Sequence, residues 1–415
     1  MSLEQHLIEG QFEEAEALMR KWIADDDFAS LYEGADTFIQ YGFFEQAALI
    51  FQEMREHFVG EDQLYIDEAS MRFELGEEEE AIRLLEEVDE ESDEYLQALL
   101  LLADHYESTG LIEAAMQKME EAYRLEPHEP IIQYGYAELL TVVGKYREAV
   151  RFYEQLRDSG IDTIGSVSLT RRLAETLASG AAYEEAIPYY EEWIAEEEVA
   201  DAYYGLAYAY FQLGNVERAT PRLETLLEMD KDYFSAYALL GQCYAKEEEN
   251  DKAYATYVEG IARDRFNKTL YLAAGKMAVK LQRVDDAMRH FEEVLALDPE
   301  HIEAREALAA LYEGEDRFDL VIELLEDEDN KTPHMEHELA LAYEEEERFE
   351  EARESYERAY PALKEEVAFL HDYASFLIEE GERDKALALA KEIVKRSPER
   401  EEWSHYIEQV EWEDE

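Results

Sequence analysis

The chain has 415 residues, 104 of them acidic and 38 basic, which gives a formal net charge of −66. Most of such a surface would repel phosphate backbones and anionic lipids, so the composition argues against broad nucleic-acid or membrane binding and favours basic protein partners. Apolar residues make up 47%, too many for a disordered acidic chain, and few glycines and prolines favour helices joined by short turns. The same carboxylates also serve as a solvated coat that keeps a long molecule soluble.

The first residues and the single cysteine indicate the cellular compartment. The chain starts with early acids and has no basic segment followed by an apolar stretch, so we expect no secretory signal. No apolar run approaches the roughly 18 residues that cross a bilayer. Cys243 excludes an intramolecular disulfide, fits a reducing compartment, and is expected to be a small core residue. We therefore expect a cytoplasmic protein.

A small residue recurs along the chain with a period close to 34 residues. These positions, called anchors below, are Ala15, Ala47, Ala81, Ala115, Ala149, Ala186, Ala219, Ala253, Ala287, Val321, Ala352 and Ala386. Twelve residues before each anchor, from the second onward, stands another small residue: Ala35, Ala69, Ala103, Ala137, Ala174, Ala207, Gly241, Gly275, Ala309, Ala340 and Ala374. Two small residues in register predict paired helices that approach closely, because no long side chain holds the backbones apart.

Larger residues and turn formers follow the same period. Four residues after the anchor, the apolar stripe of a second helix is extended by Phe51, Met119, Tyr153, Tyr190, Tyr257, Phe291 and Tyr356. The end of the first helix, where a positive φ is needed, is expected at Gly10, Gly42, Gly76, Gly110, Gly144, Gly214 and Gly381. Pro127, Pro299 and Pro398 fall between repeats, where one helix must stop before the next begins.

With this period and residue pattern, the chain resembles the tetratricopeptide repeat (TPR) family along essentially its whole length. The resemblance implies an all-α fold, an α-solenoid in which about twelve helix–turn–helix repeats form a right-handed superhelix with a C-terminal capping helix. The acidic helices and the segment Tyr-Gly-Phe-Phe-Glu at Tyr41 are also similar to the YpiA-like TPR proteins of Gram-positive bacteria. That resemblance implies a bacterial cytoplasmic protein.

In chain order, we expect one continuous solenoid with three segments. Residues 1–160 hold repeats one to four and repeat five, residues 161–330 hold repeats six to ten, and residues 331–415 hold repeats eleven and twelve with the capping helix. The anchor spacing lengthens to 37 around residues 158–165, where glycines and turn formers interrupt the helical pattern. It shortens to 31 after repeat ten, in which Val321 replaces alanine and Glu328 replaces an apolar residue. Both places are candidate joints between rigid segments.

The last helix has the features of a cap. Ser397 and Pro398 are predicted to be its N-cap and its first helical residue. Its apolar face consists of Trp403, Tyr406, Ile407 and Val410. A terminal helix with a polar outer face is what a stacked array needs for solubility.

No motif in the chain predicts catalysis. Phosphate-binding glycine loops, nucleophile elbows and cysteine zinc clusters are not found. His334 and His337 form the best metal-like pair, but their i, i+3 spacing differs from the i, i+4 spacing of His-Glu-x-x-His, and we interpret them as a solvated helix face. Exposed glutamate pairs lack the burial that would separate their pKa values. We therefore expect no cofactor, no metal site and no enzymatic activity.

The TPR resemblance implies that a peptide binds to the concave face made by the first helix of each repeat. Projected onto that face, the expected partner-binding residues are Tyr134, Arg171, Arg172, Tyr204, Tyr208, Phe211, Gln242, Lys276 and Lys280. Exposed aromatic residues beside positive charges can anchor a peptide. In the alternative interpretation the tyrosines pack against neighbouring helices and the basic residues pair internally with Glu138 or Glu175. The Lys-and-Asn pattern with which some TPR co-chaperones bind chaperone tails is absent.

The charge is distributed unevenly along the chain. Residues 61–100 hold sixteen acids and two bases, whereas residues 261–300 hold seven of each. The central-to-late repeats are therefore better suited to an acidic or neutral ligand than the N-terminal repeats.

The leading hypothesis for function is a cytoplasmic adaptor or scaffold that binds partner proteins or peptide segments in the concave TPR groove. We expect no nucleic-acid partner, no direct membrane insertion, and a monomer or weak dimer. The alternative is an acidic nucleic-acid mimic or inhibitor that occupies the basic site of a DNA- or RNA-binding protein. An enzyme is the third hypothesis.

Overall fold

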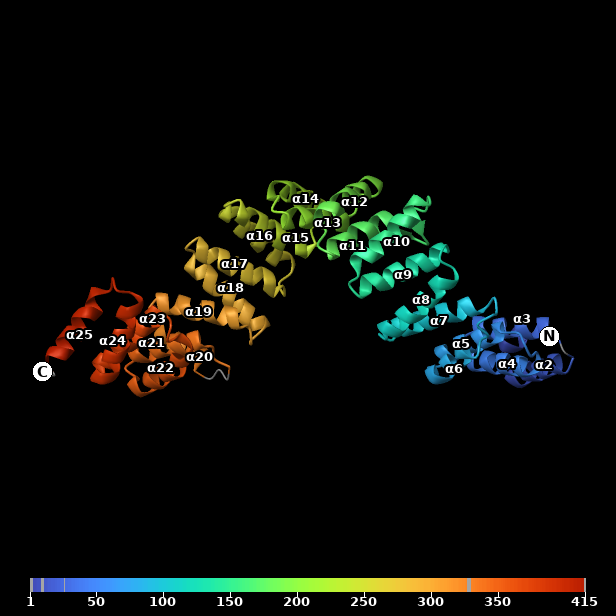
Figure 1. Cartoon of the computed structure of the whole chain (residues 1–415), viewed down its shortest axis with the longest axis horizontal. Helices are drawn as coiled ribbons and strands as arrows, with labels where there is room; N and C mark the ends of the chain where they lie inside the picture. The colour runs from blue at the N-terminus through green and yellow to red at the C-terminus, as the bar shows by residue number, and fades with distance from the viewer. Residues whose placement is uncertain (1–2, 9–10, 26, 327–329, 414–415) are drawn as a thin grey trace. The chain divides into compact units, whose positions relative to one another are not determined.

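The computed structural model describes residues 3–8, 11–25, 27–326 and 330–413, and the chain divides into two compact units, Met1–Leu213 and Gly214–Glu415. Within each unit, successive antiparallel helices pack side by side (Figure 1). No helix in these ranges is both long enough and apolar enough to cross a bilayer.

The helices of the first unit are α1 (Leu3–Ile8), α2 (Phe12–Ala24), α3 (Phe28–Gln40), α4 (Phe44–His57), α5 (Gln63–Glu74), α6 (Glu78–Glu86), α7 (Tyr95–Ser108), α8 (Ile112–Leu125), α9 (Pro130–Val142), α10 (Tyr146–Asp158), α11 (Leu169–Ser179), α12 (Tyr183–Glu196) and α13 (Ala200–Gln212). Those of the second unit are α14 (Val216–Met229), α15 (Phe234–Lys246), α16 (Asn250–Arg263), α17 (Lys268–Lys280), α18 (Val284–Leu297), α19 (Ile302–Gly314), α20 (Phe318–Leu325), α21 (Pro333–Glu345), α22 (Phe349–Leu363), α23 (Val367–Glu379), α24 (Arg383–Arg396) and α25 (Glu401–Glu413). In order, α1 to α24 correspond to the first and second helices of twelve repeats, and α25 to the capping helix. The predicted all-α solenoid of helix–turn–helix repeats is confirmed.

The predicted small residues form the core of this arrangement. All twelve anchors have an exposed fraction of 0%, and the second set of small residues is buried as well. Large side chains fill the space beside them. A Cβ added at Gly241 would lie 2.2 Å from Cε1 of Tyr257, and one added at Gly275 would lie 2.7 Å from Cε1 of Phe291. The aromatic residue four places after the anchor therefore packs directly on the small residue of the first helix.

The turns inside the repeats share one backbone geometry. Gly42, for example, has φ 78°, and the amides of Gly42 and Phe43 donate to the carbonyls of Ile39 and Phe38 at 3.0 and 2.9 Å. This is a Schellman motif, in which a left-handed residue closes the helix. Every predicted turn glycine in the described residues has a positive φ, and Gly10 lies outside them.

Five turns adopt the same left-handed geometry without glycine. Their residues are Ala181, Glu248, Gln282, Asp316 and Glu347, with φ between 57° and 63°. Propensity alone does not predict a positive φ at these residue types. The packing of the flanking helices imposes it.

The two places with unusual spacing are locally different from the other repeats. After α10, the strands β1 (Thr163–Ile164) and β2 (Val167–Ser168) form a short antiparallel hairpin. The Ser168 side chain then caps α11 by accepting a hydrogen bond from the Arg171 amide. In repeat ten, α20 has only eight residues, although Val321 is buried like the other anchors; Glu328 lies outside the described residues. The division into three segments stays a prediction.

The capping helix begins later than predicted. It starts at Glu401, and Ser397 is instead the C-cap of α24, because its amide donates to the Ile393 carbonyl at 2.7 Å. The predicted N-cap and N1 roles of Ser397 and Pro398 are therefore wrong. The predicted apolar face is confirmed: Trp403 and Val410 are buried, and the other two residues are partly buried.

Replacing Gln282 by glycine should stabilise the turn between α17 and α18. The left-handed conformation strains a residue with a Cβ and not a glycine, so the free energy of opening of these helices should rise by about 0.5–1 kcal/mol. Hydrogen exchange of the α17 and α18 amides measures the change. As the matched control, Gly110→Ala should lower the opening free energy of α7 and α8 by about the same amount. An unchanged or lower value for the Gln282 variant would contradict the packing argument.

Candidate functional site

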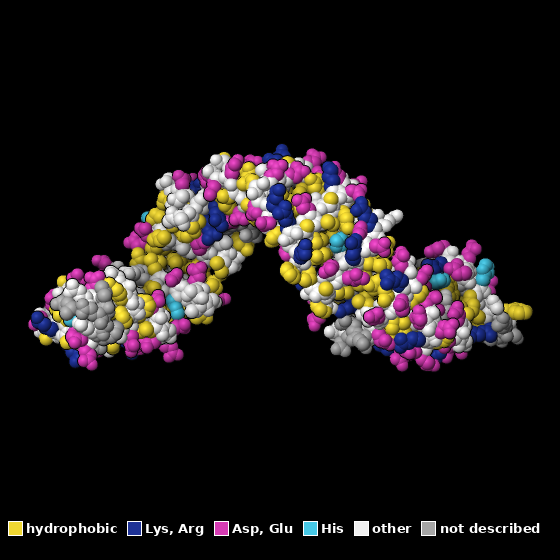
Figure 2. All heavy atoms as spheres, turned by 180° about the vertical axis from the view of Figure 1, so that it is seen from behind, with side chains coloured by type: hydrophobic (Ala, Val, Ile, Leu, Met, Phe, Trp, Pro, Cys, Tyr) yellow, Lys and Arg dark blue, Asp and Glu magenta, His cyan; other side chains and the backbone are white. Residues whose placement is uncertain are grey.

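The surface formed by the first helices of the repeats is called the first-helix face. It is made by α3, α5, α7, α9, α11 and α13 in the first unit and by α15, α17, α19, α21 and α23 in the second. All nine predicted partner-binding residues lie on these helices, and none of their side chains is fully buried. In the view of Figure 2, acidic side chains are scattered over both units among hydrophobic and other groups, with Lys and Arg between them.

The helices α9 and α11 are joined by an ion-pair network. The Arg172 guanidinium donates to Glu138, and its Nε lies 3.4 Å from the Tyr134 hydroxyl. Arg171 Nε donates to Glu175 Oε1 at 2.9 Å. Arg171 and Arg172 therefore make the internal pairs that the alternative interpretation described. Since these pairs are partly exposed, each is worth at most about 1 kcal/mol, and a partner carboxylate could exchange with them.

A group of aromatic residues projects from α13. The rings of Tyr204 and Tyr208 are one helical turn apart and stack with centroids 6.3 Å apart. Tyr208 also makes an edge-on contact with Tyr183, at 6.0 Å, and remains 36% exposed. Burial raises the pKa of the Tyr204 hydroxyl. Phe211 lies on the same helix and is half-buried. The exposed edge of this stack offers apolar area next to polar hydroxyls.

In the second unit, the predicted residues lie on the adjacent helices α15 and α17. Lys276 Nζ lies 2.5 Å from Glu303 Oε1. Gln242 and Lys280 are exposed. Lys280 has no ion-pair partner in the part of the chain that the structure describes. It is therefore the more available of the two lysines.

Three contacts of these residues were not predicted from the sequence. Tyr183 packs on Tyr208, Glu303 pairs with Lys276, and the Arg171 guanidinium lies 5.3 Å from the centroid of the Trp193 ring. Each contact joins residues 22 to 27 positions apart and on different helices. The 34-residue period fixes which helices are neighbours, but it does not say which long side chains meet.

The first-helix face of the second unit also carries a buried acidic group. Glu338 Oε2 is buried and accepts no hydrogen bond from the residues described. Burial, followed by the charges of Glu313 and Glu306, raises the pKa of Glu338 to about 8. Burial likewise raises the pKa of Glu344 to about 7, although this carboxylate accepts a hydrogen bond from Tyr356 at 3.0 Å. This part of the face is consequently sensitive to pH near neutrality.

The two predicted metal-like histidines contact different carboxylates. His334 Nε2 lies 3.8 Å from Glu366, and His337 Nε2 lies 3.1 Å from Asp372. His334 is exposed, but His337 packs edge-on against Phe369 and is mostly buried. The prediction that both histidines lie on a solvated helix face is therefore correct for His334 and wrong for His337. Within the described ranges, no three His, Cys, Asp or Glu side chains are placed to hold a metal ion.

The single cysteine is a core residue, as predicted. Cys243 is fully buried in α15, and burial raises the pKa of its thiol to about 11. The thiol is therefore uncharged near neutral pH and a poor nucleophile.

Comparison with known families and proteins confirms the repeat assignment. Residues 333–400 match the YpiA-like, C-terminal tetratricopeptide repeats, and residues 108–161 match the YpiA-like tetratricopeptide repeats. Further tetratricopeptide repeat families match residues 177–232, 234–267 and 269–301.

The sequence is 34% identical over 394 residues to the TPR repeat-containing protein YpiA of Bacillus subtilis (strain 168), covering 94% of this chain and 92% of that protein. Among solved structures, it is similar to one titled for the functional characterization of Pseudomonas aeruginosa pilF, with a TM-score of 0.40, 22% identity, and coverage of 52% of this chain and 99% of that one. It is also similar to YrrB, described as a TPR protein with an unusual peptide-binding site, with a TM-score of 0.37, 21% identity, and coverage of 46% and 96%.

Replacing Glu338 by glutamine should change how the stability of α21 depends on pH. The folded-state pKa of about 8 exceeds the ordinary value of 4.5, so between these pH values the folded state binds more protons than the unfolded state. The stabilisation that comes from the proton on Glu338 is therefore fully present below about pH 4.5 and is lost as the pH rises through about 8. The α21 amides of the Glu338→Gln variant should therefore be more protected from hydrogen exchange than those of the wild type at pH 8.5. At pH 4.5 the protection should be similar in the two proteins.

Amide hydrogen exchange of α21 at both pH values, corrected for intrinsic rates, measures this effect. Glu345→Gln, which changes an exposed carboxylate of the same helix, is the control and should keep the wild-type pH dependence. An equal pH dependence in the wild type and the Glu338 variant would contradict the burial argument.

Proposed function

Because the chain belongs to the YpiA-like family of tetratricopeptide repeat proteins, we propose that it is a cytoplasmic scaffold that binds partner proteins or peptide segments through its first-helix face. TPR proteins are generally protein-interaction scaffolds, and in the ranges that the structure describes only the short β1–β2 hairpin lies outside the helix pairs and the cap. The observation that supports the proposal best is the stacked pair of Tyr204 and Tyr208, with Tyr208 open to solvent on that face.

The aromatic residues of α13 are the proposed anchors. A tyrosine supplies a large apolar area and a hydroxyl, and it loses little conformational freedom when it is already held by a neighbouring ring. Tyr208 is held in this way by Tyr204 and Tyr183. A few such residues carry most of the binding free energy in protein interfaces.

The basic residues of the face are proposed to orient the partner. Arg171 and Arg172 can exchange their internal carboxylates for those of a partner, because a partly exposed ion pair contributes little. Lys276 and Lys280 lie in the second unit, and Gln242 adds a neutral donor and acceptor there. These charges should affect the association rate more than the final affinity.

The nucleic-acid mimic is the second candidate, and it is favoured by the excess of carboxylates. The first turn of α6, for example, carries Glu78, Glu79 and Glu80. A partner bound mainly by such charges should lose affinity steeply as salt is added, whereas a partner anchored by aromatic residues should lose less.

The test is a comparison of partner capture by the purified chain and two groups of variants. Tyr208→Ala should weaken a bound partner by about 1–2 kcal/mol or more, as expected for a central aromatic contact, and the double variant Lys276→Glu and Lys280→Glu should slow association at low salt. Partners captured from native lysate are identified, purified and measured by surface plasmon resonance at two salt concentrations. Circular dichroism should be the same for all variants.

Matched controls show whether a loss of binding is specific to the first-helix face or follows from any similar substitution. Tyr41→Ala removes a tyrosine of similar exposure outside the proposed site, and Lys385→Glu with Lys395→Glu makes the same charge change on a second helix, α24. Both controls should leave binding unchanged. If the Tyr208 variant and the Lys276 and Lys280 double variant still bind the partners while the controls lose them, the first-helix face is not the binding surface.

A further inference from the structure

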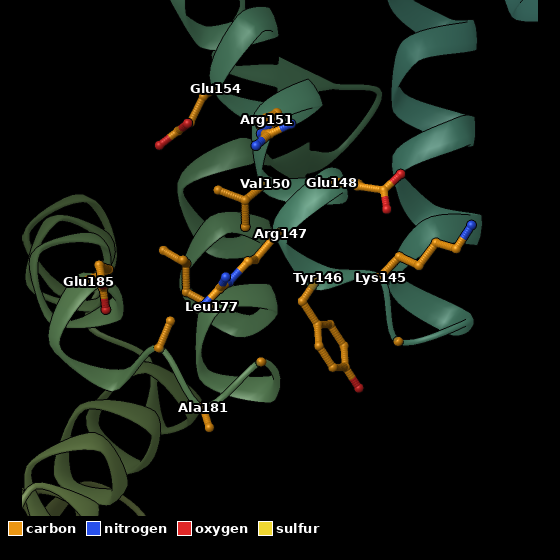
Figure 3. Close-up of a pocket in the computed structure, with 13 residues that line it drawn as sticks. Lys145, Tyr146, Arg147, Glu148, Val150, Arg151, Glu154, Leu177, Ala181 and Glu185 are labelled. Carbon is orange, nitrogen blue, oxygen red and sulfur yellow. The ribbon is translucent and has the colours of Figure 1, made fainter.

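A cavity of about 790 Å³ opens in the first unit, and none of the predicted partner-binding residues lines it (Figure 3). It is lined by the start of α10 and the turn before it, by the end of α11, and by the start of α12. Its apolar lining includes Val150 and Leu177. Tyr146 packs closely on Gly180, where an added Cβ would lie 2.9 Å from the Cβ of Tyr146. The Tyr146 side chain therefore packs on the backbone of Gly180 and closes the wall of the cavity between the two turns.

Three basic side chains at this cavity are unpaired. Lys145, Arg147 and Arg151 line it and are exposed, and none of them has an ion pair, hydrogen bond or ring contact through its side chain among the residues described. The basic residues on either side differ: Arg157 pairs with Glu192 at 2.7 Å, and Arg124 pairs with Glu120 at 2.6 Å. The chain has 104 acids, yet none of those in the described ranges pairs with these three bases.

The geometry of α10 brings two of these charges onto one side. Arg147 and Arg151 are four residues apart, so they lie one turn apart on the same face of the helix, with Val150 between them in Figure 3. Like charges at this spacing destabilise an isolated helix by about 0.2–0.5 kcal/mol. The carboxylates at the rim do not relieve the repulsion. Glu148 also lines the cavity, but in Figure 3 it points away from Arg147 and Arg151. Glu154 accepts a hydrogen bond from Tyr189 at 3.4 Å, and Glu185 lies across the cavity.

The local charge of this part of the chain also differs from the rest. The residues that line the cavity include three bases and three acids, against 38 and 104 in the whole chain. Because salt screens charges beyond about 8–10 Å, a ligand at the cavity experiences mainly these nearby groups.

We infer that this cavity binds an acidic segment of a partner protein. Arg147 and Arg151 pair with an Asp or Glu side chain of that segment, and a neighbouring apolar side chain of the segment packs on Val150 and Leu177. Guanidinium groups suit carboxylates because they can donate two parallel hydrogen bonds. The rim carboxylates Glu154 and Glu185 disfavour a continuous polyanion such as RNA, whose charges would fill the whole cavity. The site contains none of the nine partner-binding residues proposed above, and it does not depend on the function proposed for them.

The test is a selection of random twelve-residue peptides, displayed on phage, against the immobilised full-length chain. The selected pool should be enriched in Asp or Glu next to Leu, Ile or Phe. The most enriched peptide, made synthetically with a fluorophore, should bind the double variant Arg147→Gln and Arg151→Gln at least about fivefold more weakly by fluorescence polarisation.

Control variants make the result specific to the cavity. Arg83→Gln with Arg124→Gln removes the same charge from exposed, paired arginines, and it should bind like the wild type. Tyr208→Ala should also bind like the wild type, which distinguishes this site from the first-helix face. All changed arginine side chains are exposed, so the fold should persist, and circular dichroism checks this.

Three results would overturn the inference. The first is a selected pool without acidic residues, or acidic peptides that bind all variants equally. The second is binding of a twelve-nucleotide RNA that the Arg147 and Arg151 variant loses, since this would identify a nucleic-acid site. The third is concentration-dependent self-association in sedimentation that the same variant abolishes, since the occupant would then be a second copy of the chain.

Discussion

The close approach of paired helices at small residues is the constraint on which the rest of this structure depends. From the second repeat onward, the anchor of the second helix and the small residue of the first helix are buried, and at Gly241 and Gly275 an aromatic side chain packs directly on the small residue. Interiors packed at this density tolerate neither an added methyl group nor a missing ring without a cost in stability. The same contact therefore sets the distance between the helices, the geometry of the turn, and the faces that remain open to solvent.

Two kinds of surface follow from this packing. The first helices present side chains that are not needed for the core, and on α13 these are the stacked tyrosines. The turns and the starts of the second helices form another surface, and there the unpaired arginines of α10 border a cavity. A surface with a large excess of acids discourages nonspecific association, so local departures from it are the places where specific partners can bind.

The sequence predicted the features that repeat. The 34-residue period of small residues predicted the helix pairs, the buried anchors, and the glycine turns, because each rests on contacts within one repeat or between neighbouring repeats. It did not predict the five left-handed turns without glycine, since at Gln282 or Glu347 the packing of the flanking helices overrides the preference of the residue. The hairpin at residues 163–168 and the late start of α25 were missed because turn formers there allow several local structures.

The candidate site was predicted less completely than the fold. The sequence register placed all nine side chains on first helices, but the internal pairs of Arg172 with Glu138 and of Lys276 with Glu303 depend on how long side chains cross between helices. His337 was interpreted as solvated, yet it packs on Phe369 of the next repeat. The cavity near Arg147 was not predicted either, because an unpaired charge is recognised only when its surroundings are known.

A double-mutant cycle at Gly241 and Tyr257 tests the central packing constraint most directly. An added Cβ at Gly241 would lie 2.2 Å from the ring of Tyr257, so Gly241→Ala alone should lower the opening free energy of α15 and α16 by about 1–3 kcal/mol. In the background of Tyr257→Leu, whose side chain leaves room for the methyl group, the same change should cost almost nothing. Hydrogen exchange of these helices in the four proteins measures both values. If Gly241→Ala costs the same in both backgrounds, helix spacing is not set by this contact, and the account of the repeat fails.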